Sequence, residues 1–273
     1  MRIGIISDVH IDKNNVQNEG TVQEALGRIV QETGTDLLII AGDVSNNYAT
    51  TLSFLEEMER RSGVDCLFVP GNHDLWNIDY PEKDAWALYR HLQEFKGNIT
   101  TAPYHINDEW VVVGDVGWYD FSFGSDKFAE ARFQEMEYNE RIWKDKIYAD
   151  WGSSAPEVHQ FFYQKLRNQI KRHKDKKIIL VTHVVPHENF IVPTPHPVWD
   201  YFNAFLGSRH YSDLITEFPD TIKYAICGHV HYRKQFQLGE TSLICNCLGD
   251  KEEWLHSEEA YEEISHTYLT IEI

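Results

Sequence analysis

The sequence has few cysteines for its length. Only four occur in 273 residues, and all of them lie in or beside short apolar runs: Cys66, Cys227, Cys245 and Cys247. A scaffold held together by disulfides needs a much higher density of cysteine, so that class of protein is excluded. Cys245 and Cys247 share one face of an expected strand, which favours core packing over metal binding. We therefore expect four buried, reduced thiols.

Positive charge is also scarce. The chain contains 25 Lys and Arg against 43 Asp and Glu, which gives a formal net charge of −18. This balance disfavours sequence-independent binding to nucleic acid phosphates or to an anionic membrane. No cluster of Lys and Arg marks the basic groove that a nuclease would need. A negatively charged substrate would require positive charge supplied locally.

Long apolar runs are absent from the sequence. None approaches the length of a membrane-spanning helix, and the N-terminal stretch MRIGIISDVH has no apolar core of the kind found in secretion signals. These absences predict a soluble, cytoplasmic protein. Fixed-period repeats and low-complexity linkers are missing as well, so we expect a single domain over residues 1–273. Nothing in the sequence indicates the oligomeric state.

Short β-branched runs alternate with helical patterns along the chain, which is typical of an α/β layered architecture. Strands are predicted at residues 2–7, 36–42, 66–71, 110–118, 177–183, 224–229, 235–239, 241–249 and 267–273. The runs 235–239 and 241–249 predict a hairpin that turns at Gly239 and Glu240. Helices are expected between the strands.

Two of these helices have recognisable ends. The segment 21–34 opens with Thr21 and Glu24 in the spacing of a capping box. A second helix is predicted at residues 50–61 and should end at Gly63, because glycine commonly follows the last turn of a helix.

Polar side chains follow five of the expected strands at the point where each strand ends. In chain order they are Asp8 and His10, then Asp43, then Asn72 with His73 and Asp74, then His183, and finally His229 and His231. In open α/β sheets ligands bind at this edge because loops from several strands converge there. Packing alone does not explain why five strands would deliver only Asp, Asn and His to one edge.

The region between residues 118 and 151 is irregular. It mixes aromatic residues, a glycine and a charged helix-like stretch, which indicates an insertion. Because the strand at 110–118 should end at the ligand-binding edge, we expect the insertion to lie beside that edge. Insertions on such scaffolds commonly carry substrate specificity.

The residue types at the strand ends are metal ligands of the nitrogen and oxygen kind, suited to Mn, Fe, Zn or Co. Seven ligands drawn from these nine residues would be more than one tetrahedral ion requires, so two ions fit better. Asp43 is the natural bridge because it is the lone acid between two ligand sets. His229 and His231 share a face if the backbone is extended, but a turn after Gly228 could aim them at different ions.

Five short motifs in chain order strengthen this interpretation. They are Asp8-Val9-His10, Gly42-Asp43, Gly71-Asn72-His73-Asp74, His183 and Gly228-His229-Val230-His231. Together they resemble the five-part signature of the calcineurin-like metallophosphoesterases, over residues 8–231. The resemblance implies an α/β fold in which two mixed β-sheets pack as a sandwich with flanking helices, in four αββα layers. It also implies a dinuclear metal site at the strand ends.

The resemblance further implies a role for each residue of the motifs. One metal ion would be held by Asp8, His10 and His231, and the other by Asn72, His183 and His229. Asp43 would bridge the two ions. His73 would be a catalytic residue that binds no metal, and Asp74 would be its orienting partner.

The implied reaction is hydrolysis of a phosphoester with two divalent or trivalent transition-metal ions, Mn, Fe or Zn. Two metals about 3.5–4 Å apart can lower the pKa of a bridging water, and the hydroxide so formed attacks phosphorus in line. Protonated His73 would supply a proton to the leaving group. Asn72 would bind a metal through its oxygen and orient a phosphoryl oxygen of the substrate through its amide N–H.

Several alternatives stay open at this level. The phosphorylated substrate is either a phosphodiester or nucleotide, which we favour, or a phosphomonoester or phosphoprotein. A non-catalytic scaffold for a protein partner would have lost ligands or His73, and none is missing. His187 and Arg233 are candidate substrate contacts, although a loop hydrogen bond and a surface arginine are the commoner roles. Four aromatic residues suit either base stacking or the core: Trp76, Tyr80, Trp118 and Tyr119.

Overall fold

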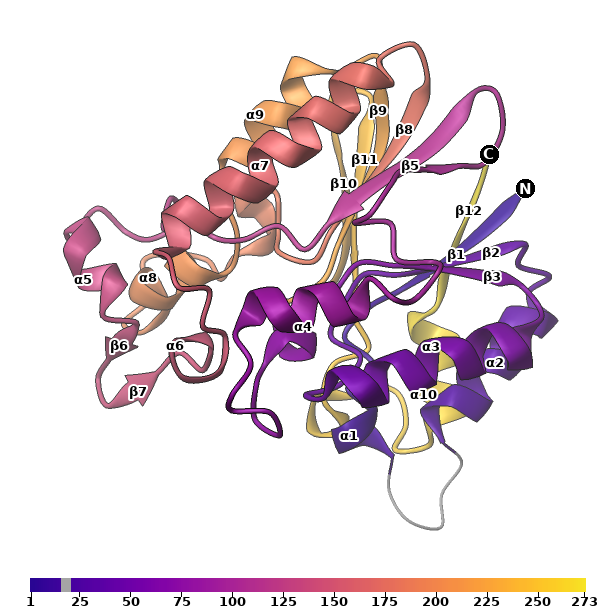
Figure 1. The fold of residues 1–273 in the computed structure, drawn as a ribbon, viewed down its shortest axis with the longest axis horizontal. Coiled ribbons are helices and arrows are strands. Elements are labelled where there is room, and N and C mark those ends of the chain that lie inside the picture. The colour runs from indigo at the N-terminus through magenta and orange to yellow at the C-terminus, as the bar shows by residue number, and fades with distance from the viewer. Residues whose placement is uncertain (16–20) are drawn as a thin grey trace.

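The computed structural model describes residues 1–15 and 21–273, and Figure 1 shows how its strands and helices are arranged. A four-stranded sheet has the order β12-β1-β2-β3. Its strands are β1 (Arg2–Ile6), β2 (Leu37–Ile40), β3 (Asp65–Phe68) and β12 (Leu269–Glu272). The first three run parallel, whereas β12 lies antiparallel to β1 at the edge. This sheet is therefore mixed.

A six-stranded sheet has the order β10-β11-β9-β8-β5-β4. Its strands are β4 (Tyr104–His105), β5 (Trp110–Asp115), β8 (Lys177–Thr182), β9 (Ile222–Cys227), β10 (Arg233–Leu238) and β11 (Thr241–Asn246). The four inner strands are parallel and the two edge strands are antiparallel to their neighbours. β10 and β11 form the expected hairpin, with Leu238 opposite Thr241.

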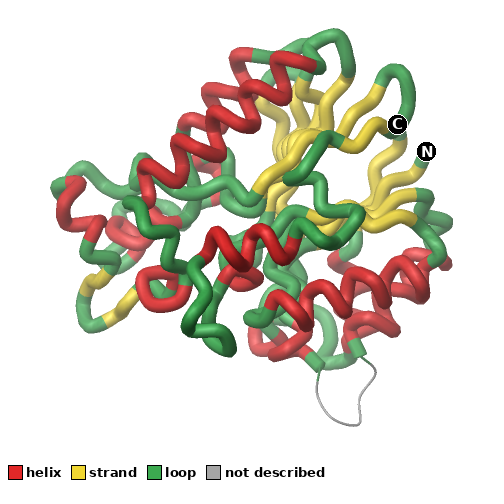
Figure 2. The backbone as a smooth tube through the Cα atoms, in the orientation of Figure 1, coloured by secondary structure: helices red, strands yellow, loops and turns green. Residues whose placement is uncertain are grey.

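Helices cover the outer faces of the two sheets, as Figures 1 and 2 show. The six-stranded sheet carries α7 (Ala155–Arg172) and α9 (His210–Glu217). The four-stranded sheet carries α2 (Val22–Glu32), α3 (Tyr48–Ser62) and α10 (Ala260–Thr267). The predicted architecture, two mixed sheets flanked by helices, is therefore confirmed.

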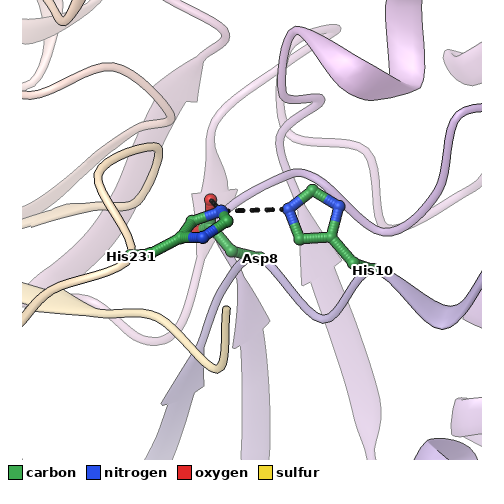
Figure 3. A group of neighbouring side chains, drawn as sticks. All are labelled: Asp8, His10 and His231. Atoms are coloured by element: carbon green, nitrogen blue, oxygen red, sulfur yellow. Dashed lines mark hydrogen bonds and ion pairs between the residues drawn. The ribbon is translucent and has the colours of Figure 1, made fainter. Parts of the chain in front are cut away.

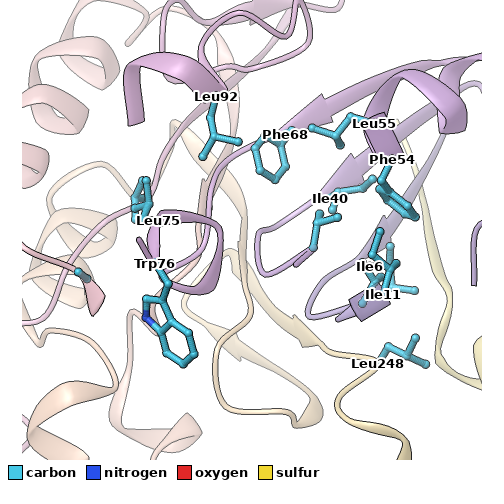
Figure 4. Packing of buried hydrophobic residues seen from close by; sticks show 14 of the residues in the cluster. Ile6, Ile11, Ile40, Phe54, Leu55, Phe68, Leu75, Trp76, Leu92 and Leu248 are labelled. Atoms are coloured by element: carbon cyan, nitrogen blue, oxygen red, sulfur yellow. The ribbon is translucent and has the colours of Figure 1, made fainter. Parts of the chain in front are cut away.

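The central strands are buried on both faces, which explains their continuous apolar sequences. In β2, Leu37 and Ile39 belong to the core layer between the sheets, while Leu38 and Ile40 belong to the cluster under the helices. Figure 4 shows Ile40 in this helix-side cluster, together with Phe54 of α3. Successive residues of a strand point to opposite faces, so one short run fills two layers of core.

The helix ends follow from side-chain caps. Thr21 accepts a hydrogen bond from the N–H of Glu24 (3.2 Å), and Glu24 accepts one from the N–H of Thr21 (3.1 Å), so the predicted capping box is confirmed. Helix α3 begins at Tyr48, earlier than expected, because the side chain of Asn47 caps it. It ends at Gly63, whose φ of 75° is the left-handed conformation that glycine adopts readily.

The two sheets are joined at the carboxyl ends of β1 and β11. The N–H of Ser7 donates to the carbonyl of Asn246 (3.2 Å), and the N–H of Leu248 donates to the carbonyl of Ser7 (2.9 Å). Ser7 thereby pairs with Cys247 as an isolated parallel bridge. The carboxyl ends of strands from both sheets consequently open toward the same place.

The segment 118–151 contains only short elements. They are α5 (Glu130–Gln134), β6 (Glu137–Tyr138), β7 (Arg141–Ile142) and α6 (Asp145–Tyr148). The segment packs against α8 (Trp199–Phe202), where the ring of Tyr138 stacks on that of Tyr201 with centroids 5.0 Å apart. The other short elements are α1 (Ile11–Asn14), α4 (Ala85–Leu92), η1 (His73–Leu75), η2 (Glu188–Phe190), η3 (Asn203–Phe205) and η4 (Lys251–Glu253).

All four cysteines are buried and form no disulfide, which confirms the expectation of core thiols. Within residues 1–15 and 21–273, no helix combines the length and the apolar character needed to cross a membrane. The cytoplasmic location stays a prediction.

Candidate dinuclear metal site

Side chains that follow five strands of the two sheets meet where the carboxyl ends of β1 and β11 join the sheets. They are Asp8 and His10 after β1, Asp43 after β2, Asn72 and His73 after β3, His183 after β8, and His229 and His231 after β9. Five of them have left-handed backbone conformations, with φ values of 52° (Asp8), 37° (His10), 55° (Asp43), 75° (His229) and 52° (His231). Each such conformation costs about 1 kcal/mol or more for a residue with a side chain, so the surrounding contacts must maintain these sharp turns.

One group of ligand atoms surrounds the carboxylate of Asp43. Its Oδ2 lies 3.2 Å from Nε2 of His183. The side-chain oxygen of Asn72 lies 3.0 Å from the same nitrogen and 2.9 Å from Nδ1 of His229. These two imidazole nitrogens are 3.2 Å apart. Four ligand atoms from four residues thus converge on one small volume.

Each of these two imidazoles has an inner nitrogen that faces the group and an outer nitrogen that points away from it. The hydrogen bond of the outer nitrogen determines whether the inner nitrogen carries a lone pair. Nδ1 of His183 lies 2.9 Å from the carbonyl oxygen of Ala41, and Nε2 of His229 lies 3.1 Å from that of Phe205. A carbonyl only accepts, so each outer nitrogen is the N–H donor. When the two rings are neutral, the inner nitrogens and the two side-chain oxygens described above are acceptors that face one another. A cation satisfies such a set, and metal-binding histidines commonly donate their second N–H to a carbonyl.

A second group is formed by Asp8, His10 and His231, which Figure 3 shows. Nε2 of His10 lies 3.1 Å from Nε2 of His231, and Oδ1 of Asp8 lies 3.6 Å from the latter nitrogen. Nδ1 of His231 donates to Glu253, which directs the lone pair of Nε2 toward the group. Nδ1 of His10 is buried without a hydrogen-bond partner among the described residues. Oδ2 of Asp43 lies 3.9 Å from Nε2 of His10, so this carboxylate is within reach of both groups.

Asp43 dominates the electrostatics of the site. Burial acts to raise the pKa of Asp43, but the surrounding imidazoles, His183 foremost, hold it well below its ordinary value. Burial likewise acts to lower the pKa of His183, whereas the charge of Asp43 raises it to about 10. The buried carboxylate is therefore charged and attracts positive charge, which a metal ion would supply.

Two glycines of the motifs are required because the backbone approaches the ligands closely. A Cβ atom on Gly71 would lie 2.1 Å from Oδ1 of Asp43, and one on Gly228 would lie 2.4 Å from Oδ2 of Asp8. Both separations are far below van der Waals contact, so any side chain at these positions would displace a carboxylate. This closeness explains why glycine precedes the polar residues in both motifs.

His73 belongs to the same site and is held by neighbours of its own. Its Nδ1 lies 2.6 Å from the side-chain oxygen of Asn46, and its Nε2 lies 4.0 Å from Oδ2 of Asp43. The ring packs on the indole of Trp76, with centroids 3.6 Å apart. Burial lowers the pKa of His73 well below its ordinary value, although Asp43 acts in the opposite direction. Because Asn46 accepts from Nδ1–H, Nε2 is left to face the pocket.

Asp74 does not orient His73, so this expectation from the sequence is wrong. The buried carboxylate of Asp74 accepts five hydrogen bonds, from the N–H groups of Asp43, Val44, Ser45 and Gly71 and from the hydroxyl of Thr51. The reason lies in the 3-10 turn η1, in which successive side chains point about 120° apart. Asp74 therefore fastens the loops after β2 and β3 to each other, and Asn46 takes its expected place beside the imidazole.

The orientation of Asn72 is fixed by Asp145, a residue that the sequence did not single out. Oδ1 of Asp145 accepts from the amide nitrogen of Asn72 (2.8 Å) and from the indole of Trp76 (2.7 Å). Oδ2 accepts from the indole of Trp143 (2.8 Å) and from the hydroxyl of Tyr119 (3.2 Å). Because the amide nitrogen is committed to this carboxylate, the amide oxygen faces the two imidazoles.

This contact bears on the substrate role expected for Asn72. One N–H of its amide donates to Asp145, so only the second N–H could reach a phosphoryl oxygen, and that contact stays a prediction. Asp145 lies in the irregular segment 118–151 and follows no long strand. No signal of the kind used for the strand-end residues marks it in the sequence.

The two ligand groups open into a pocket of about 350 Å³. Besides residues of the ligand groups, its lining contains Lys13, Trp76, Ile142, Trp143, Lys144 and Asp250. Residues 142–145 all line it, so the segment 118–151 forms one wall, as expected. Two lysines supply positive charge: Lys13 pairs with Asp250 (2.8 Å), whereas Lys144 is exposed and forms no ion pair with any described residue.

The two weaker candidates for substrate contact lie outside this lining. Nδ1 of His187 accepts from the N–H of Asn189 (3.0 Å) and caps the turn η2, which is the loop hydrogen bond considered as its alternative. The guanidinium of Arg233 pairs with the buried Glu263 (2.6 Å), and the Arg233 side chain is only 15% exposed. A phosphate contact and a surface position are therefore both wrong for Arg233, because Glu263 holds its charge inside the fold.

The aromatic residues divide between the pocket and the core. Trp76 lines the pocket, whereas Trp118 and Tyr119 are each 1% exposed and belong to the core. Trp143, which the sequence did not single out, is the second aromatic wall, and its ring centroid lies 5.8 Å from that of His229. Both tryptophans donate their indole N–H to one carboxylate, so the wall is rigidly attached to the metal-ligand shell.

The fold and the two ligand groups together define a metal-dependent phosphoesterase. Residues 1–233 match the family of calcineurin-like phosphoesterases. The chain belongs to this family, as the five motifs predicted. The family depends on a dinuclear metal centre, and the donor set described above fits such a centre.

Several solved structures share this fold at low sequence identity. A phosphopantetheinyl hydrolase from Mycobacterium tuberculosis has a TM-score of 0.73 and 18% identity, over 92% of this chain and 90% of that one. A protein from Thermus thermophilus has a TM-score of 0.55 and 14% identity, over 98% and 97%. A dimetal phosphatase from Danio rerio has a TM-score of 0.55 and 12% identity, over 98% and 91%. At these identities the likeness concerns the fold alone. No curated protein sequence matches the chain.

Proposed function

We propose that the protein is a dinuclear metal-dependent phosphodiesterase that acts on small organic phosphodiesters, including nucleotide-type compounds. One observation carries this proposal. Two groups of acceptor atoms share the carboxylate of Asp43, in a pocket that also contains His73 and an apolar, aromatic wall. The two groups of acceptor atoms suit a pair of metal ions, and His73 suits the role of a proton donor. The apolar, aromatic wall suits an organic substituent on the phosphate.

The proposed ligands divide into two sets around Asp43. One ion would be held by Asp8, His10 and His231, the other by Asn72, His183 and His229, and Asp43 could contribute to both. The nitrogen and oxygen donors fit Mn, Fe or Zn. When bound, two such ions polarise the phosphoryl oxygens and supply a hydroxide nucleophile near neutral pH. The outer nitrogens of three of the histidines are already held by acceptors, so the ligands are aligned before an ion binds.

His73 is the proposed proton donor to the leaving group. Asn46 holds Nδ1–H, so a proton carried on Nε2 faces the pocket. Transfer of this proton breaks the Nε2–H bond, leaves a neutral imidazole, and lets the leaving oxygen depart as an alcohol. Burial holds the pKa of His73 low, so the ring takes up this proton against the effect of burial, and the charge of Asp43, 4.0 Å from Nε2, favours the protonated form.

The pocket itself supports a small organic substrate. Its volume of about 350 Å³ lies at the lower end of the range for small-molecule sites. Lys144 supplies positive charge for the phosphate at the rim, while Trp76, Ile142 and Trp143 offer an apolar surface for a substituent. The Mycobacterium tuberculosis protein with a TM-score of 0.73 is named a phosphopantetheinyl hydrolase, so phosphopantetheinyl esters belong among the substrates to try.

In the same proposal, the segment 118–151 is the part of one catalytic domain that selects the substrate. It brings three substrate-facing residues, 142–144, to the pocket wall. It also brings Asp145, which holds a metal ligand, so selection of the substrate and binding of the metal are connected in this segment.

A substrate panel tests the proposal. Protein loaded with Mn²⁺ is assayed with cyclic and linear nucleotide diesters, phosphopantetheinyl esters, dinucleoside polyphosphates, mononucleotides and phosphopeptides. We expect one class of diester to be hydrolysed at least tenfold faster than the corresponding monoesters. Asp43→Ala should abolish this activity, while His266→Ala, which changes a half-exposed histidine on α10, should keep it.

The outcomes separate the alternatives. Preference for monoesters or phosphopeptides would replace diesterase activity by phosphatase activity at the same metals. No hydrolysis of any class, with two ions bound per chain, would favour the non-catalytic scaffold. At most one ion per chain with full activity would contradict the dinuclear centre.

A further inference from the structure

A second cluster of potential metal ligands lies outside the pocket described above. It combines Asp120 from the loop after β5, His159 from α7 and His210 from the first turn of α9. The side chains of Asp120 and His159 are 7% and 4% exposed, while that of His210 is 56% exposed. One ligand atom of each residue lies within 4.8 Å of the other two. The cluster is thus buried on two sides and open to solvent at His210.

His159 is oriented in the way that metal-binding histidines are. Its Nδ1 lies 3.0 Å from the carbonyl oxygen of Trp118, and since a carbonyl only accepts, Nδ1 carries the hydrogen. Nε2 therefore presents a lone pair, which faces Oδ2 of Asp120 at 3.6 Å. Burial lowers the pKa of His159, although Asp120 acts in the opposite direction. A cation between this lone pair and the carboxylate would be attracted to both.

The spacing between His159 and Asp120 suits a single ion. Zinc bonds of about 2.0–2.1 Å in tetrahedral geometry place ligand atoms about 3.3–3.5 Å apart. The 3.6 Å between His159 and Asp120 is close to this value and is too long for a direct hydrogen bond. Nδ1 of His210 lies 2.6 Å from the same carboxylate oxygen, which is a hydrogen-bond distance, so its exposed ring would move outward to make room for the ion. The hydroxyl of Ser208, 2.7 Å from that oxygen, completes the surroundings.

We infer that Asp120, His159 and His210 form a third metal site, which binds one divalent transition-metal ion such as Zn²⁺. Two imidazole nitrogens and one carboxylate oxygen are ligands that this class of ion prefers, whereas Ca²⁺ and Mg²⁺ prefer oxygen alone. Water takes the fourth position on the exposed side of His210. This site shares no residue with the dinuclear centre and does not depend on the proposed function.

The role of the site is structural, because it joins segments that support the dinuclear centre. On one side, Tyr119 next to Asp120 donates its hydroxyl to Asp145, which holds a metal ligand. On the other side, the chain that leads to His210 contains Phe205, whose carbonyl accepts from a histidine of the dinuclear centre. An ion bound here would tie both segments to α7.

Counting zinc per chain tests the site. Protein stripped with a chelator is reloaded with excess Zn²⁺, passed over a gel-filtration column and analysed by mass spectrometry for zinc. The wild-type chain should carry one zinc more than His210→Ala. His266→Ala is the matched control, because His266 is a comparably exposed helical histidine (46%) and should keep the wild-type zinc content.

A second variant separates this site from the dinuclear centre. Asp43→Ala removes the shared carboxylate, and adding His210→Ala to it should still remove one zinc per chain. Circular dichroism shows whether each variant keeps the fold, and the exposed position of His210 makes its loss tolerable. Equal zinc content in the wild type and His210→Ala would overturn the inference. The inference would also be overturned if the zinc ion that depends on His210 in the wild type were lost in Asp43→Ala.

Discussion

Nδ1 of His73 lies 2.6 Å from the side-chain oxygen of Asn46, and this contact sets the tautomer of the imidazole. An amide oxygen accepts a hydrogen bond without carrying charge, so it fixes the ring with Nδ1–H and Nε2 toward the pocket. A carboxylate in the same place would raise the pKa of the ring much more. The neutral partner thus orients His73 while leaving it able to release its proton.

Removal of His73 should affect substrates according to their leaving groups. His73→Ala should lower the rate on an alkyl or nucleoside ester by about 10²–10⁴-fold, the usual contribution of a general acid. A p-nitrophenyl ester should suffer much less, because its phenolate leaves without a proton. Rates against leaving-group pKa, with metal content measured in both proteins, check this expectation. A slope no steeper than that of the wild type, or a lost metal ion, would show that His73 is not the donor.

Removal of Asn46 should reproduce this effect in a weaker form. In Asn46→Ala the imidazole stays but can rotate and change tautomer, so the rate on a poor leaving group should fall about tenfold. Asn46→Asp keeps an acceptor at the same place and serves as the matched control, with a smaller loss. Both variants should retain the metal content of the wild type. Equal losses on good and poor leaving groups would mean that Asn46 acts on something other than proton transfer.

Asp74→Asn should destabilise the fold rather than slow proton transfer. Two N–H groups, those of Asp43 and Gly71, donate to one carboxylate oxygen, and an amide nitrogen in its place would leave both without an acceptor. Each buried donor left unpaired costs about 1–3 kcal/mol, so the free energy of unfolding should fall by about 2–6 kcal/mol. Urea unfolding of the metal-free protein measures this change. Unaltered stability would contradict the structural role of Asp74.

Asp145→Ala should weaken metal binding although Asp145 itself is no ligand. Without this acceptor the amide of Asn72 can flip and turn its nitrogen toward the imidazoles, so affinity for one of the two ions should fall about 10–100-fold. Titration of the metal-free protein with Mn²⁺ tests the expectation. Asp126→Ala, an exposed aspartate of the same segment, should bind both ions normally. Two unchanged affinities in Asp145→Ala would remove it from the ligand shell.

Trp143 should influence which substrate is preferred. Trp143→Ala removes one aromatic wall of the pocket and should raise KM for substrates with large apolar substituents by about tenfold, with a small aryl ester affected least. Trp143→Phe keeps the wall but loses the indole N–H to Asp145, so it separates packing from hydrogen bonding. Relative rates across the substrate panel are the measurement. Identical preferences in both variants and the wild type would make the wall a structural feature only.

The strand-end residues could be read from the sequence because each follows a short apolar run directly. A buried strand is recognisable from its composition, and the topology of parallel strands places all their carboxyl ends together. Asp43 and His183 were found in this way although they lie in different sheets. Nothing comparable reveals Asn46, because its contact with His73 depends on how the loop after β2 folds.

The errors have a similar origin in tertiary contacts. Adjacency in sequence made Asp74 the expected partner of His73, but the geometry of a 3-10 turn directs neighbouring side chains apart. The surface role considered for Arg233 failed because its partner, Glu263, lies on α10 and is remote in sequence. Asp145 and Trp143 reach the site through the irregular segment, where no periodicity predicts direction.

The antiparallel pairing of β1 with β12 has a consequence for the order in which the molecule is made. Strand β1 contains residues 2–6 and its edge partner contains residues 269–272, so residues 7–268 are synthesised between them. At about 5–20 residues per second, β1 waits many seconds with one edge exposed, and an exposed edge can pair with other chains. Asp8 and His10 directly follow this strand. The metal-binding end of β1 should therefore reach its final form only after residues 269–272 have been made.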